Sequence, residues 1–164
     1  MWSVAKHQLE NARLLATHDQ GRPRQASLRR AVSTAYYALF QALCETCADT
    51  LVGWEKPWEA FTPVFRALDH GRTGNAILHS SLATRPDVQR LGAAFKELQA
   101  ARIWADYNPE PRPDFQEGGA SPPFTRGEAL KLVQAAQEAV EILDRLDQDA
   151  RLRLVARLVG NTKR

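Results

Sequence analysis

The stretch "AVSTAYYALFQALC", residues 31–44, decides the fold that we predict for this chain. Its apolar side chains recur at the three- and four-residue steps that keep them on one helical face. Together with Cys47, which lies just after the stretch, they form two stripes. One consists of Val32, Ala35, Leu39 and Ala42, and the other of Tyr36, Phe40, Leu43 and Cys47. A helix that is apolar on two sides is covered by neighbours on both. We therefore predict a central helix over residues 25–49.

The sequence on either side of this stretch is also helical in pattern, and glycine and proline interrupt it. Proline at position 57 fits the first turn of a helix, and "DHG" at 69–71 is typical of a helix end with a glycine cap. We expect further helices at 2–18, 57–68, 73–80, about 84–107 and 125–158. Together they predict one all-α domain over residues 1–164, an up-and-down bundle of four to five helices.

A long irregular segment separates the last two predicted helices. Residues 108–124 hold five prolines and two glycines, which predicts a surface loop, and loops of this length often carry function. After it, Thr125 and Glu128 have the spacing of a capping box, so we expect the last helix to begin there.

Composition and charge narrow the class of protein. Apolar residues make up 44% and charged residues 25% of the chain, as in ordinary globular domains. No apolar run is long enough to span a membrane, and the N-terminus lacks the apolar block of a secretory signal. We therefore expect a cytoplasmic protein that does not bind membranes. The net charge of +3 includes arginine clusters at 22–30 and 151–157, which suit either nucleic acid contact or solvated helix faces.

The two cysteines, Cys44 and Cys47, have the spacing of half a metal site or of a redox pair. No second pair of ligands accompanies them, and they fall inside a predicted helix. We therefore predict two small buried side chains, with no bound metal and no cofactor.

The stretch "ELQAARIWADYNP", residues 97–109, places Arg102 on the apolar face that carries Leu91, Phe95 and Leu98. Asp106 lies four residues later and can pair with Arg102, and Tyr107 follows. Arg102 could hold a phosphate in a cleft, or it could form an intrahelical ion pair that closes the bundle. Both interpretations stay open from the spacing.

These stretches resemble the HEPN domain family, small prokaryotic helical bundles. "AVSTAYYALFQAL" is similar to the Ser-x-x-Tyr-Tyr-Ala-x-Phe signature of the family's second helix. "RALDHG", "ELQAARIWADYNP" and "FTRGEALKLVQAAQEAVEIL" resemble its later parts in the same order. The resemblance implies a homodimer with a cleft between two copies of the later helix. It also implies a toxin–antitoxin or defence setting, often beside a nucleotidyltransferase.

The ribonuclease members of the family carry an arginine and a histidine four to six residues apart, and they cleave RNA without metal. Here Arg102 matches, but Asp106 and Tyr107 stand where the histidine is expected. A phenol is a poor general base at neutral pH, and pairing with Arg102 should weaken Asp106 as a base. His70, beside Asp69, could supply the missing imidazole, or it could be an ordinary polar residue at a helix end.

Ser33, Tyr36 and Tyr37 place hydroxyl groups on the central helix, and such groups need hydrogen-bond partners. We expect them to satisfy one another, or to join Arg102 and Asp106 in a buried network beneath the cleft. A direct ligand contact by these residues is the alternative.

Three functional hypotheses follow. The leading one is a HEPN-type module that binds a nucleotide, an RNA phosphate or a nucleotidyltransferase partner through Arg102, Asp106 and Tyr107. The second is a divergent metal-independent endoribonuclease. The third is a structural dimerisation module, and the catalytic residues, if there are any, stay unassigned.

Overall fold

A computed structural model describes residues 3–53, 55, 57–79, 82, 84–108 and 124–160 of the 164-residue chain. The predicted loop lies outside these residues except at its two ends. The described residues contain no strand and form seven helices: α1 (Ser3–Thr17), α2 (Gln25–Leu51), α3 (Trp58–Phe65), α4 (His70–Leu78), α5 (Pro86–Tyr107), α6 (Arg126–Arg145) and α7 (Gln148–Gly160). The all-α prediction is confirmed, and the helices are more numerous than the four to five predicted.

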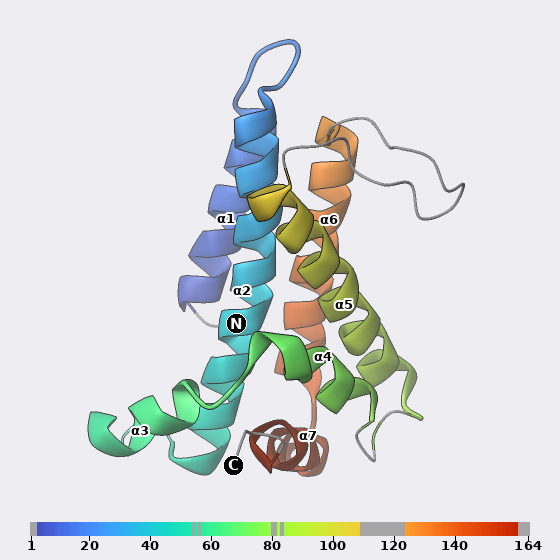
Figure 1. Ribbon diagram of the computed structural model, residues 1–164. Coiled ribbons are helices and arrows are strands. Elements are labelled where there is room, and N and C mark those ends of the chain that lie inside the picture. The colour runs from blue at the N-terminus through green and yellow to red at the C-terminus, as the bar shows by residue number, and fades with distance from the viewer. Residues whose placement is uncertain are drawn as a thin grey trace.

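Helix α2 is the centre of the bundle, as its two apolar stripes predict. It packs against α1 on one side and against α5 and α6 on the other, and it also contacts α3 and α7 (Figure 1). Tyr36, Leu39 and Leu43 are fully buried. Helix α2 ends two residues later than predicted, because Gly53 at φ +80° turns the chain and donates its N–H to the carbonyl of Asp49 at 3.0 Å.

The segment "DHG" begins a helix, so the prediction that it ends one is wrong. The side chain of Asp69 accepts hydrogen bonds from the backbone N–H groups of Gly71 at 2.9 Å and Arg72 at 3.2 Å. Aspartate is among the strongest N-cap residues, and here this preference outweighs the glycine signal. Helix α4 therefore starts at His70 instead of residue 73, and α3 has already ended at Phe65.

The predicted last helix is divided into α6 and α7. The capping box is present, since the Thr125 side chain accepts from the Glu128 N–H and the Glu128 carboxylate accepts from the Thr125 N–H. Leu146 has extended backbone angles and breaks the helix. Asp147 then accepts a hydrogen bond from the N–H of Ala150 at 2.8 Å, within the first turn of α7. Figure 1 shows α7 crossing the lower end of the bundle, and it contacts α2 and α4.

The prediction that Cys44 and Cys47 are buried is confirmed, and both are free thiols in α2. In the part of the chain that the structure describes, no group of three or more His, Cys, Asp and Glu side chains could hold a metal ion. None of the described helices is long and apolar enough to cross a membrane.

Candidate functional site

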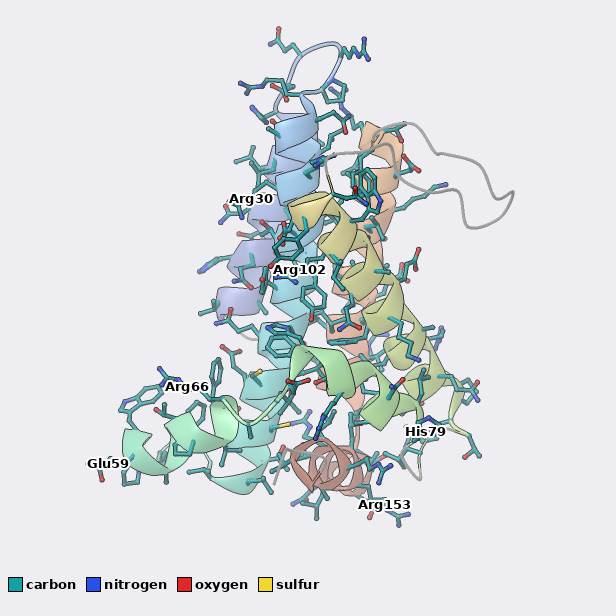
Figure 2. The ribbon with its side chains drawn as sticks, in the orientation of Figure 1. Arg30, Glu59, Arg66, His79, Arg102 and Arg153 are labelled. Carbon is teal, nitrogen blue, oxygen red and sulfur yellow. The ribbon has the colours of Figure 1, made fainter. Side chains whose placement is uncertain are left out.

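Arg102 lies between α5 and α2 near the front of the bundle (Figure 2). Its side chain is 15% exposed, so it is covered by neighbours and does not extend into solvent. The Nε atom lies 2.9 Å from Oδ2 of Asp106, one turn further along α5. The N–H of Nε does not align with that oxygen, so the contact is an ion pair without a well-formed hydrogen bond at Nε.

Three tyrosine rings surround the guanidinium group of Arg102. Its Nη2 donates to the hydroxyl of Tyr37 and, at 3.3 Å, to that of Tyr107. Its central carbon lies 5.2 Å from the ring centres of Tyr37 and Tyr107 and 5.8 Å from that of Tyr36, within cation–π range. Burial opposes the charge, but the Tyr37 hydroxyl and the other nearby oxygens leave the pKa of Arg102 raised. Arg102 is therefore a charged side chain that these rings and oxygens keep in place.

Ser33 and Asp106 connect the two helices beneath Arg102. The Ser33 hydroxyl donates to Oδ2 of Asp106 at 3.1 Å, and Ser33 itself is 1% exposed. Asp106 therefore binds both the guanidinium of its own helix and a hydroxyl of α2. The hydroxyls of Ser33 and Tyr37 thus share one network with Arg102 and Asp106, whereas the hydroxyl of Tyr36 lies against His70.

The site reaches the surface through Tyr107, which is 69% exposed at the last turn of α5. Its ring and hydroxyl both contact Arg102, so the guanidinium lies directly behind an exposed tyrosine. Helix α5, which carries both residues, ends at Tyr107, just before segment 109–123 begins.

His70 joins the same cluster from α4. Its Nδ1 lies 2.7 Å from the Tyr36 hydroxyl, and its ring stacks on Phe40 with centroids 3.8 Å apart. Burial, and then the charge of Arg102, lowers the pKa of His70, while burial raises the pKa of Tyr36. At neutral pH this is therefore a neutral imidazole beside a neutral phenol.

Asp69 has a different role from its neighbour. Its carboxylate is occupied by the backbone N–H groups at the start of α4, so it positions His70 and does not reach the Arg102 cluster. Sequence reasoning missed Phe40 and Gln99, which hold His70 from the other sides. Phe40 supplies the stacking surface, and the side chain of Gln99 donates to the carbonyl of His70. Phe40 follows Tyr36 by four residues on α2, so the predicted apolar stripe already placed these two side chains on one face.

Several arginines of the two predicted clusters make contacts within the fold. Arg29 donates to the carbonyl of Asn108 at 2.8 Å and lies over the Trp104 ring, and Arg24 pairs with Asp19. Arg151 donates to carbonyls at the end of α6. Arg30 is exposed and lies on the same side of the bundle as Arg102 in Figure 2.

No family model, curated protein or solved structure matches this chain. The fold and the site define the class of protein: an all-α bundle with a tyrosine-lined arginine between two of its helices. A functional assignment has to come from the chemistry of these side chains.

Proposed function

We propose that this protein is a HEPN-type module that binds the phosphate group of a nucleotide or of RNA at Arg102. The observation that carries this proposal is the position of Arg102: a charged guanidinium that is largely covered by tyrosine rings and lies directly beside the exposed Tyr107. Arginine is the side chain best suited to planar, charge-assisted recognition of phosphate oxygens.

The tyrosines support a nucleotide or an RNA over a bare anion. Tyr107 presents an exposed ring next to the guanidinium, and nucleobases stack on such rings in single-stranded nucleic acid sites. The exposed Arg30 on the same side adds a second positive charge for a neighbouring phosphate. We extend the proposal to a homodimer in a toxin–antitoxin or defence system with a nucleotidyltransferase partner, because the sequence motifs resemble HEPN domains.

Asp106 makes the proposal testable, because it competes with phosphate for the same guanidinium. Binding of ATP and of a fluorescent single-stranded RNA is measured for wild type, Arg102→Ala and Asp106→Asn. Loss of one charge-assisted contact in Arg102→Ala should weaken binding about 10- to 100-fold. Asp106→Asn keeps the shape but frees the guanidinium, so its affinity should rise. Equal binding by all three proteins would overturn the proposal.

One observation favours a second candidate, a metal-independent endoribonuclease. The structure brings a neutral His70 to Tyr36, whose ring also faces Arg102, so an imidazole and a guanidinium share one cluster without lying in one motif. A neutral imidazole can act as a general base on a ribose hydroxyl. Cleavage of a mixed RNA pool in EDTA by wild type, and its loss in both His70→Gln and Arg102→Ala, would establish this activity. No cleavage by any of the three would leave phosphate binding as the function.

A further inference from the structure

The two ring nitrogens of His70 have different surroundings. Nδ1 lies 2.7 Å from the hydroxyl oxygen of Tyr36, which is fully buried. No hydrogen bond within the described part of the chain involves Nε2, and His70 is exposed at the start of α4. Phe40 covers one face of the ring, with the two ring centres 3.8 Å apart. His70 therefore has one nitrogen engaged inside the protein and the other available to a ligand.

The hydroxyl of Tyr36 determines which nitrogen of His70 carries the proton. A neutral imidazole has one N–H donor and one acceptor nitrogen, and the hydrogen bond of one nitrogen fixes the state of the other. His70 is neutral at pH 7, because burial and then the charge of Arg102 lower its pKa. Burial raises the pKa of Tyr36, so the phenol keeps its proton. This buried O–H needs an acceptor, and among the described residues Nδ1 of His70 is the one within reach.

Tyr36 therefore donates to Nδ1, and the proton of the neutral imidazole is on Nε2. In the opposite tautomer Nδ1–H would donate to the phenol oxygen. The buried phenol proton would then have no acceptor, which would destabilise the folded protein. The Nε2–H group of His70 is thus a fixed hydrogen-bond donor, and this nitrogen cannot accept a proton.

The guanidinium group of Arg102 lies near this donor, beside the same two tyrosine rings. The centre of the Tyr36 ring is 5.8 Å from the central carbon of Arg102 and 5.7 Å from the centre of the His70 ring. The corresponding distances from the Tyr37 ring are 5.2 and 6.0 Å. A charged donor and a neutral donor therefore adjoin one pair of rings, close enough to bind neighbouring groups of one ligand.

We propose that the Nε2–H group of His70 binds a second phosphate group of the ligand whose first phosphate is held by Arg102. This inference rests on the phosphate site proposed above. It narrows the ligand to molecules with two phosphate groups, either a nucleoside diphosphate or two successive nucleotides of RNA. Phosphate oxygens are strong acceptors, so a fixed N–H donor suits them. The same tautomer argues against the endoribonuclease, because a protonated nitrogen is not a general base.

Long-range proton–nitrogen correlation NMR of the full chain tests the tautomer directly. In wild type, Nδ1 of His70 should have the chemical shift of an unprotonated nitrogen and Nε2 that of a protonated one. Tyr36→Phe removes the donor to Nδ1 and should move the Nδ1 shift. The signals of His79, which is exposed at the other end of α4, should stay unchanged. A protonated Nδ1 in wild type would overturn the proposal.

Calorimetric titration with AMP and ADP, and with the dinucleotides UpU and pUpU, tests the second phosphate. In at least one pair, wild type should bind the member with the additional phosphate at least about tenfold more tightly, and that pair identifies the source of the ligand. His70→Asn keeps an acceptor near Tyr36 but lacks Nε2–H, so it should bind both members of a pair about equally. His70→Gln places an amide N–H near the position of Nε2 and should retain most of the preference.

The matched control is His79→Asn, the same substitution at the far end of α4, which should keep the wild-type preference. No preference in either pair, or an unchanged preference in His70→Asn, would overturn the proposal. Failure of the proposed function has a different signature, because AMP and UpU would then bind Arg102→Ala as tightly as wild type. Circular dichroism checks that each variant is folded. If His70→Asn does not fold, the wild-type preference and the NMR tautomer decide the question.

Discussion

At the scale of single residues, two charged side chains hold positions where apolar ones would be expected. Arg102 follows Leu98 on the buried face of α5, yet its charge is stable there because tyrosine rings, hydroxyl groups and Asp106 surround it. Glu45 is almost as buried as its apolar neighbours, but no described donor reaches its Oε2. The first residue is stabilised by its surroundings and the second is not.

Glu45 should therefore make stability depend on pH. Its pKa is raised from 4.5 to about 7 in the folded protein, so folding favours the protonated form. Its contribution to stability is intact below about pH 4.5 and is lost as the pH rises towards 7. Glu45→Gln does not titrate at this position. The free energy of unfolding of Glu45→Gln minus that of wild type should therefore rise by about 2 kcal/mol from pH 5 to pH 8.

Urea unfolding of both proteins at the two pH values measures this difference. Glu97→Gln changes an exposed glutamate on α5 and is the matched control, for which the difference should stay flat. A Glu45→Gln difference that is the same at both pH values would contradict the prediction.

At the scale of elements, the ends of the helices position the site. Asp69 starts α4 and so places His70 against Phe40 and Tyr36. Leu146 interrupts the C-terminal helical sequence, which lets α7 turn across the end of the bundle and line a pocket of about 550 Å³ together with Asp49 and Thr50 of α2. These helix ends thus position side chains of the Arg102 cluster and of the pocket.

Removal of the α4 cap should loosen His70 as well as the helix. Asp69→Ala loses both backbone hydrogen bonds and should lower the free energy of unfolding by about 1 kcal/mol. Asp69→Asn retains an acceptor oxygen and should stay near wild type. Chemical denaturation measures both variants, and the NMR shift of the His70 ring should move only in Asp69→Ala. Equal stability of the two variants would exclude capping as the role of Asp69.

The contact between α4 and α5 depends on a glycine. A Cβ atom at Gly92 would lie 2.5 Å from Cδ2 and 2.8 Å from Cγ of Leu78, much too close. Gly92→Ala should therefore lower the free energy of unfolding by about 1–3 kcal/mol despite the better helix propensity of alanine.

Gly127, in the first turn of α6, is the matched control for this substitution. A Cβ there meets only Oγ1 of Thr125 at 3.9 Å, so Gly127→Ala should raise the free energy of unfolding by about 0.5–1 kcal/mol. Thermal unfolding followed by circular dichroism compares the two. Stabilisation by both alanines would show that α4 and α5 separate easily.

At the scale of the whole molecule, α2 connects the Arg102 cluster with the pocket at its carboxyl end. Its middle carries Ser33, Tyr36 and Tyr37 of the Arg102 cluster, and its last turn carries Asp49 and Thr50 of the pocket wall. The cluster and the pocket are about 18 Å apart along the axis of α2, from the helix rise between Tyr37 and Asp49. Helix α3 projects sideways from the lower end of α2 (Figure 1).

The proposed homodimer would use the exposed apolar surface beside Arg102. Ile103 and Tyr107 are one turn apart on α5 and are 49% and 69% exposed. Wild type should show twice the chain mass of 18.4 kDa in light scattering, and Ile103→Glu should shift it to the single-chain value. Leu152→Glu, at a residue that is 50% exposed on α7, should leave the dimer intact. A wild-type mass of one chain would refute the dimer.

Much of the fold and part of the site could be predicted because they depend on local geometry. The central position of α2, the capping box and the face shared by Arg102 and Asp106 all follow from residue spacing along a helix. The start of α4 was mispredicted because "DHG" carries a cap signal for either end of a helix, and the N-cap preference of Asp69 outweighs the glycine signal.

The sequence by itself determined which segments are helical and which faces are apolar, since backbone hydrogen bonding imposes one period on every helix. Only the tertiary structure decided that His70 meets Tyr36, 34 positions away, and that Arg102 meets Tyr37, 65 positions away. It also brought Arg151 to the pocket wall beside Asp49. Such contacts depend on how the helices cross and how their ends are placed, and helical periodicity specifies neither.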